Sequence, residues 1–445
     1  MSNPLHEKIS SLESSGVDRA VCRSIEELIT KGDPVELSRL VPPRLAARWK
    51  AHEDAVLDAF LAGTRAGLFE LQWDVKCPSC AGPAAHASHL AQLTSDSRCQ
   101  LCDLDFAGSF DESVEVTWRP HPAVMDLSNV DPASVVMGHS APSFVADVAV
   151  PARSEARIDV DLTHGNYLLR APSIDAVRGI YIGPDTIEAR DTLSLAIVDQ
   201  RIERGPWRRP AGPYSVVVRS SSTEPQPFAI FKVSDRPWIS AARLAAHQGF
   251  RDLFSKELIS TDESFTIKSA AFVFTDIKGS TELYERVGDA RAYPLVRDHF
   301  QIMGLAVKRN GGAIVKTIGD AVMATFMTSA SAVRFALDML EEFDRFNASD
   351  PNCDAIIVKV GVHAGPCIAV TSNDRLDYFG RTINTAARVQ GLSRGRDLVM
   401  SRSVAESVGV QTIVDAAPYR SESFEAELKG IASAFEVTRL VRARV

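Results

Sequence analysis

The sequence predicts a multidomain chain of the α+β class, and three observations support this fold class. The C-terminal part, residues 266–445, alternates short apolar runs of the β type with longer segments of helical periodicity. The middle part, residues 140–235, holds repeated short runs of alternating polarity between Gly, Pro and Asp turns. The first part, residues 1–75, has apolar residues at helical spacing. A chain of 445 residues has room for about two to four such domains.

Composition and charge narrow the class of protein. An apolar fraction of 45% and a charged fraction of 24% are ordinary for a globular chain. The net charge of −8 argues against general nucleic-acid binding, so we expect no nucleic-acid partner. The start, residues 1–16, lacks the apolar core of a signal peptide, and no apolar run is long enough to span a bilayer. We therefore expect a cytoplasmic protein without a membrane span.

The first part is predicted to be helical and resembles a winged helix-turn-helix. Helical periodicity covers residues 17–31 and 45–68, with Val41-Pro42-Pro43 between them and a turn signal at Ala62-Gly63. A strand-like run over residues 69–75 follows. Such folds bind DNA or serve as dimerisation or partner modules, and the acidic chain makes DNA the weaker alternative.

Four of the seven cysteines form two Cys-x-x-Cys pairs within residues 76–125: Cys77, Cys80, Cys99 and Cys102. Two such pairs at this spacing are typical of a zinc ribbon, in which four thiolates hold Zn²⁺ tetrahedrally and pin a small β-unit. Four soft ligands leave no open coordination position, so the predicted zinc is structural. The alternatives are ordinary structural thiols or a redox-active disulfide pair. His86 and His89, between the pairs, are predicted to be surface residues.

The segments that follow are predicted to be rich in strands. A strand over residues 113–120 ends at a proline. Six further runs have strand character: residues 144–150, 156–162, 167–170, 192–198, 214–219 and 227–233. Their spacing predicts an antiparallel β-sandwich over residues 140–235, to which we assign a regulatory role.

Residues 236–265 join the β-rich part to the C-terminal part. Residues 237–260 carry an apolar stripe at helical spacing, so we predict one helix there. A helix in this place can transmit small rotations from one domain to another. The alternative is a passive linker.

Two aspartates of the C-terminal part have the setting of a metal–triphosphate site. The string FVFTDIKGST puts Asp276 at the end of an apolar run, before the small-residue turn Gly279-Ser280-Thr281. Glycine lets the backbone approach phosphates, and free N–H groups at a helix start point at them. Asp320 lies in a Gly-Asp turn of a predicted hairpin. Two such carboxylates can hold two Mg²⁺ ions, one activating an attacking hydroxyl and one stabilising a leaving phosphate. Taken singly, each aspartate is explained equally by a helix cap or a turn.

A second set of polar residues lies around the string LDYFGRTINTAARV. Asn384 and Arg388 are four residues apart in an apolar helical pattern, so they share one helix face. A guanidinium that reaches a pentavalent phosphorus supplies positive charge where negative charge develops. Asp377 lies near the start of this string, and Lys316 precedes Asp320 in VKTIGDAVM.

These strings, in this order, resemble the catalytic domain of class III nucleotidyl cyclases from about residue 270 onward. The resemblance implies a role for each matching residue. Metal binding is assigned to Asp276, Ile277 and Asp320, adenine selection to Lys316 and Asp377, ribose orientation and transition-state stabilisation to Asn384 and Arg388, and triphosphate binding to Gly279, Ser280, Thr281 and Lys429.

The resemblance also implies a fold, a reaction and an assembly. The fold is a ferredoxin-like βαββαβ domain, with strands at residues 270–274, 313–317, 321–326 and 356–362 and helices at residues 280–286, 293–310, 330–347 and 382–391. The reaction converts ATP to 3′,5′-cyclic AMP and pyrophosphate with two Mg²⁺ or Mn²⁺ ions per active site. The active species is a head-to-tail homodimer with its sites at the interface.

The residues favour ATP over GTP as the substrate. Adenine offers N1 as an acceptor and an exocyclic amine as a donor, which a lysine and an aspartate complement. Guanine has the opposite pattern, and guanylate-specific members of the family carry a glutamate where this chain has Lys316. The alternatives are a cyclase of GTP or another nucleotide, and a catalytically weak dimer scaffold that senses a ligand. The N-terminal half resembles an uncharacterised bacterial region found on such cyclases, so we expect an unknown soluble ligand or protein as its regulator.

Overall fold

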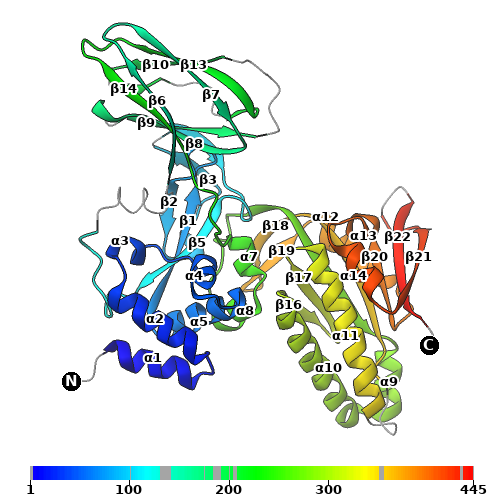
Figure 1. Ribbon diagram of the computed structural model, residues 1–445. Coiled ribbons are helices and arrows are strands. Elements are labelled where there is room, and N and C mark those ends of the chain that lie inside the picture. Colours follow the sequence, from blue (N-terminus) through cyan, green and yellow to red (C-terminus); the bar gives the residue numbers. More distant parts are fainter. Residues whose placement is uncertain are drawn as a thin grey trace. The chain divides into compact units, whose positions relative to one another are not determined.

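The computed structural model describes residues 4–100, 102–130, 142–174, 176–183, 192–199, 201–203, 208–349, 355–430 and 434–443. The chain forms two compact units (Figure 1). The N-terminal unit comprises residues 1–108 and 112–239, and the C-terminal unit comprises residues 109–111 and 240–445. The mixed helix and sheet content predicted from the sequence is confirmed. Within the described part of the chain, no helix combines the length and apolar character needed to cross a membrane.

The N-terminal unit begins with five helices: α1 (Pro4–Ser14), α2 (Arg19–Lys31), α3 (Pro34–Leu37), α4 (Pro42–Trp49) and α5 (Glu53–Arg65). The helical periodicity predicted over residues 45–68 is divided between α4 and α5, because the chain breaks at Lys50, which adopts a left-handed conformation with φ of 54°. The expected turn at Ala62-Gly63 is wrong. Gly63 lies inside α5, where the Phe69 ring leaves no room for a Cβ atom.

A small three-stranded sheet follows the helices. Its central strand β1 (Phe69–Lys76) pairs with β2 (Pro83–Ala87) and with β5 (Val114–Pro120). Trp73 and Trp118 are fully buried, which anchors β1 and β5. The 3₁₀ turn η1 (Leu90–Gln92) leads to a separate hairpin of β3 (Asp96–Cys99) and β4 (Leu104–Ala107).

The middle of the chain forms two sheets that share one apolar core. One sheet has the order β11-β10-β13-β7 and the other the order β12-β9-β8-β14-β6. Their bounds are β6 (Ser143–Val150), β7 (Glu155–Leu162), β8 (Gly165–Ala171), β9 (Ala176–Ile182), β10 (Thr192–Val198), β11 (Arg201–Ile202), β12 (Arg208–Arg209), β13 (Gly212–Ser220) and β14 (Gln226–Lys232), with the 3₁₀ turn η2 (Pro172–Ile174) after β8. Two of the pairings, β10 with β13 and β9 with β12, are parallel, unlike the fully antiparallel sheets expected.

The segment that enters the C-terminal unit is two short helices, so the prediction of one helix over residues 237–260 is wrong. Helix α7 (Ala241–Ala245) begins at Ser240, whose side chain accepts a hydrogen bond from the Arg243 N–H. Helix α8 (Gln248–Leu253) begins after His247, which has extended backbone angles. The apolar residues of the stripe are divided between the two helices and a following segment without regular secondary structure.

One eight-stranded sheet organises the C-terminal unit, with the order β16-β17-β15-β18-β20-β22-β21 and β19 paired to β18 (Figure 1). The elements in chain order are β15 (Phe265–Ile277), α9 (Ser280–Val287), α10 (Asp289–Arg309), β16 (Ala313–Ile318), β17 (Ala321–Phe326), α11 (Ser329–Ser349), β18 (Val358–Ser372), β19 (Arg375–Phe379), α12 (Arg381–Gly391), β20 (Asp397–Ser401), α13 (Arg402–Ala405), α14 (Val410–Ala416), β21 (Tyr419–Ala426) and β22 (Phe435–Arg442). Strands β15 and β18 are longer than the expected runs, and a bulge between Ile267 and Ala270 lets β15 continue through its polar start.

Alternating residues of the sheet face two apolar clusters. Leu398 and Met400 of β20 belong to the large core that includes helices α10 and α11. Val399, between them, belongs to a smaller cluster with Val389 of α12. Because side chains alternate across a strand, α12 covers the face opposite to α10 and α11.

Candidate active site and candidate metal centre

The two predicted metal-binding aspartates meet at one end of the sheet in the C-terminal unit. Asp276 lies next to the end of β15, and Asp320 lies in the turn of the adjacent β16–β17 hairpin, after Gly319 with φ of 63°. The Ile277 N–H donates a hydrogen bond to Asp320 Oδ2 at 3.3 Å. Burial, and then the charge of Asp320, raise the pKa of the Asp276 carboxyl. Two half-buried carboxylates that repel each other offer oxygen ligands to a hard divalent cation, and such a cation would neutralise their negative charge.

The turn predicted to bind phosphate, Gly279-Ser280-Thr281, begins three residues after Asp276. Gly279 precedes the first residue of α9 and has φ of 69°, a left-handed conformation that glycine adopts without strain. A Cβ atom there would lie 3.3 Å from Glu282 Oε2. Ser280 and Thr281 form the first turn of α9, where backbone N–H groups have no partner inside the helix. The turn therefore has the backbone of an anion-binding helix start.

Lys316 and Asp377, predicted to select the base, form an ion pair with Nζ and Oδ2 2.5 Å apart. Asp377 is buried, with 7% of its surface exposed, and its Oδ1 accepts a hydrogen bond from the Tyr378 N–H at 2.8 Å. The two side chains come from β16 and β19, which are remote in sequence. The fold thus brings together a hydrogen-bond donor and an acceptor that the sequence analysis assigned to the same role.

Helix α12 carries Asn384 and Arg388 and lies very close to β18. Gly361 of β18 makes this approach possible, because a Cβ atom there would lie 2.1 Å from the Gln390 backbone nitrogen. Asn384 is exposed and Arg388 is half-buried. The Arg388 guanidinium lies about 3.5 Å from where a Cβ atom of Gly430 would be, so the Lys429-Gly430 segment runs beside it.

The predicted site residues fall into separate groups within one chain. Among the described residues, no hydrogen bond or ion pair links the Asp276–Asp320 group to the Lys316–Asp377 pair or to Arg388. Sequence analysis missed Lys359, which lies opposite Asp276 in the β15–β18 ladder. The charge of Lys359 partly offsets the rise in the pKa of Asp276. Only the register between the two strands reveals this neighbour.

The four cysteines of the two Cys-x-x-Cys pairs converge in the N-terminal unit. Their sulfur atoms all lie within 4.8 Å of one another, and all four residues are buried, so the group could hold a metal ion. The sandwich supports this group: Asn166 Nδ2 donates to the carbonyls of Pro78 and Ser79 at 2.8 Å. Gly179 of β9 lies against Cys80, where a Cβ atom would come within 2.6 Å of the Cys80 backbone.

Comparison with known families gives one match in the N-terminal unit and one in the C-terminal unit. Residues 4–141 match a family of unknown function, DUF5939. Residues 263–431 match the family of the adenylate and guanylate cyclase catalytic domain. The resemblance inferred from the motifs is confirmed for this segment.

Each of the curated relatives named below matches about a third of this chain. Adenylate cyclase 2 of Rhizobium meliloti (strain 1021) is 31% identical over 154 residues, which are 32% of this chain and 42% of the relative. The adenylate cyclase of Anabaena cylindrica is 29% identical over 150 residues, which are 31% of this chain and 30% of the relative. The match therefore spans less than half the length of either relative. The crystal structure of the adenylyl cyclase CyaB from P. aeruginosa is 22% identical and covers 41% of this chain and 97% of that one, with a TM-score of 0.36.

Proposed function

We propose that this chain is an adenylate cyclase that converts ATP to 3′,5′-cyclic AMP and pyrophosphate. The observation that carries the proposal is the Lys316–Asp377 pair, held 2.5 Å apart in the segment that matches the cyclase domain. A lysine can donate to adenine N1, and an aspartate can accept from the exocyclic amine. The strand order β16-β17-β15-β18 corresponds to a ferredoxin-like βαββαβ core, which supports the same assignment. The names of the matching relatives agree with it.

The chemistry is an in-line displacement within one ATP molecule. The ribose 3′-oxygen attacks the α-phosphorus, its proton passes to solvent water, and the bond between the α-phosphorus and the oxygen of the β-phosphate breaks to release pyrophosphate. Two Mg²⁺ or Mn²⁺ ions, when bound, would activate the 3′-hydroxyl and stabilise the leaving phosphate. Asp276, Asp320 and the Ile277 carbonyl would hold them. The Gly279-Ser280-Thr281 turn and Lys429 would bind the triphosphate.

Asn384 and Arg388 would act on the reacting atoms. Arg388 would place its positive charge beside the phosphorus as negative charge builds up there. Asn384 would orient the ribose so that its 3′-oxygen faces the α-phosphorus. Both lie on α12, whose position against β18 is fixed by the close contact at Gly361.

The active species we propose is a head-to-tail homodimer. Lys316 and Asp320 lie four residues apart in one tight hairpin, so they cannot easily face the same ATP. Two sites that each take the aspartates of one chain and Lys316, Asp377, Asn384 and Arg388 of the other resolve this conflict.

Mixing two inactive variants tests the shared site. Asp320→Ala and Arg388→Ala should each be inactive alone. A random equal mixture should recover at most about a quarter of wild-type activity, because half of the dimers are mixed and each has one of two sites intact. Absence of recovery after demonstrated subunit exchange would reject the two-chain site.

One assay separates the proposed reaction from its alternatives. The purified full chain is incubated with ATP, GTP, CTP or UTP and with Mg²⁺ or Mn²⁺, with and without cell extract as a source of regulator, and products are identified by mass spectrometry. We expect cyclic AMP as the main product. A different cyclic nucleotide would overturn the base assignment, and no product from any nucleotide would favour the ligand-sensing scaffold.

For the N-terminal half we propose a structural Zn²⁺ on Cys77, Cys80, Cys99 and Cys102, because their sulfur atoms form one buried group. We also propose that this half regulates the cyclase in response to a soluble ligand or a protein. We further propose that the chain is divided into five parts: residues 1–75, 76–125, 140–235, 236–265 and 266–445. A cytoplasmic location is proposed too, since both ATP and reduced thiolates are available there.

A further inference from the structure

The short helix α8 contacts both strands that carry the predicted adenine-binding pair. Gln248 Oε1 accepts a hydrogen bond from the Ile314 N–H at 2.7 Å, two residues before Lys316 on β16. Arg251 Nη1 donates to the Leu376 carbonyl at 2.9 Å, directly before Asp377 on β19. One turn of helix therefore touches the backbone beside each member of the pair.

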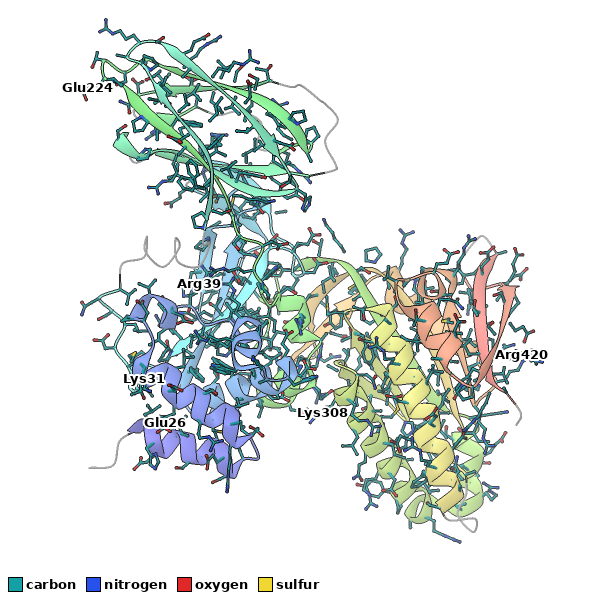
Figure 2. The ribbon with its side chains drawn as sticks, in the orientation of Figure 1. Glu26, Lys31, Arg39, Glu224, Lys308 and Arg420 are labelled. Carbon is teal, nitrogen blue, oxygen red and sulfur yellow. The ribbon has the colours of Figure 1, made fainter. Side chains whose placement is uncertain are left out.

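Gln248 binds the edge strand β16 at the point where its pairing with β17 is irregular. Strand β16 lies at the end of the sheet, and its register with β17 shifts between Ile314 and Lys316. A bulge of this kind re-aims the side chains that follow it. The Gln248 amide is itself held, since its Nε2 donates to Asp252 Oδ1 at 2.8 Å. Asp252 in turn pairs with Lys308 of α10 at 2.9 Å, and Lys308 is labelled in Figure 2.

Arg251 holds the other strand. Its guanidinium lies 5.5 Å from the centre of the Tyr378 ring, which is buried. A second contact reaches the same hairpin, because Thr371 Oγ1 donates to the Ile259 carbonyl at 2.6 Å. Thr371 pairs with Leu376 in the β18–β19 ladder. The segment before the catalytic domain thus braces both strands of this hairpin.

We propose that Gln248 and Arg251 are positioning residues that set the separation of Lys316 and Asp377 and thereby the preference for adenine. No backbone ladder joins β16 to β19 directly, because β17, β15 and β18 lie between them in the sheet. Helix α8 is an element in contact with both. The inference rests on the proposed function, since it takes Lys316 and Asp377 as the base-binding pair. It deepens that function by giving the linker a direct effect on substrate recognition.

The test measures binding of nucleotides that cannot cyclise. Dissociation constants of 3′-deoxy-ATP and 3′-deoxy-GTP are measured on the full chain with Mg²⁺ by calorimetry. Wild type should prefer 3′-deoxy-ATP, and Gln248→Ala and Arg251→Ala should each reduce the ratio of the two constants by about tenfold, the value of one lost charged or buried hydrogen bond. Arg251→Lys keeps the positive charge and should disturb the fold less than Arg251→Ala. It should restore part of the ratio of the two dissociation constants. Lys256→Gln, an exposed change in the same linker, is the matched control and should leave the ratio unchanged.

The possible outcomes distinguish the positioning role of Gln248 and Arg251 from a purely structural role, and both from failure of the proposed reaction. Variants that weaken both nucleotides equally, with the ratio intact, would reduce Gln248 and Arg251 to structural residues and overturn the inference. A wild type without base preference would overturn both the inference and the assignment of Lys316 and Asp377. A wild type that prefers 3′-deoxy-ATP but forms no cyclic AMP would count against the proposed reaction alone, and the ratio in the variants would still decide the inference.

Discussion

The cysteine group and the aspartate pair differ in how completely they enclose the space between their ligand atoms. Four sulfur atoms lie within 4.8 Å of one another, and all four cysteines are buried. The two carboxylates come from β15 and the β16–β17 turn, and both residues are only partly buried. Four thiolates would fill every position around a tetrahedral Zn²⁺ ion, whereas two carboxylates would leave most positions around an octahedral Mg²⁺ ion free. The first is therefore suited to hold a fold together and the second to receive a substrate.

The largest effect is expected at the Asp276–Asp320 pair. Asp276→Ala or Asp320→Ala should lower cyclic AMP formation by about a thousandfold or more, since several kcal/mol of transition-state stabilisation depend on the metals they hold. Thermal unfolding should change little, because both carboxyls are only partly buried. The measurement is the initial rate with saturating Mg²⁺ and ATP. Glu285→Gln, an exposed change on α9, is the matched control, and activity in either alanine variant within tenfold of wild type would refute the aspartate site.

Changes in the cysteine group should alter the stability of the fold and not the rate of the reaction. Cys77→Ser should remove about one Zn²⁺ per chain and lower the free energy of unfolding of the N-terminal unit by at least about 3 kcal/mol, because structural zinc supplies folding energy. Elemental analysis and calorimetry measure the two effects. Cys22→Ala, which removes a buried thiol outside the group, controls for loss of a cysteine alone. Equal metal content and equal melting temperatures of the two variants would favour the alternative that the four cysteines are ordinary structural thiols.

A smaller effect is expected from the ion pairs of the C-terminal unit. Arg439 and Asp397 are 3.0 Å apart and almost fully buried. Arg439→Met should destabilise this unit by about 3 kcal/mol, since it leaves the buried Asp397 carboxylate without its cationic partner. Arg402→Met breaks exposed pairs with Glu406 and Glu436 and should cost much less, because water and salt screen exposed charges. Equal costs of the two substitutions in urea unfolding would contradict the role of burial.

The motifs of the C-terminal unit could be predicted because each has a local signature. An apolar run that ends in Asp276, a Gly-Asp turn and a helical spacing of Asn384 and Arg388 are all visible without the fold. The strands and helices of this unit follow the expected order, with β17 found at the expected residues. The pairing of cysteines into one group also follows from spacing alone.

What could not be predicted depends on contacts between distant residues. Lys359 becomes a neighbour of Asp276 only through the register of β15 and β18. The break at Lys50 and the division of the linker into α7 and α8 arise because tertiary packing overrides a continuous helical pattern. Parallel pairing of β10 with β13 is equally invisible, because alternation of polarity does not encode strand direction.

The contact between α12 and β18 has a consequence for how changes in this sequence are interpreted. Gly361 has no side chain and touches no reacting group, yet any larger residue would push the backbone of Gln390 outward by about an ångström. Arg388 lies on the same helix, and a displacement of that size can cost about a hundredfold in rate. A naturally occurring variant at position 361 would look harmless by chemistry and remote from substrate. We expect it instead to behave as a loss of catalytic function in a protein that still folds.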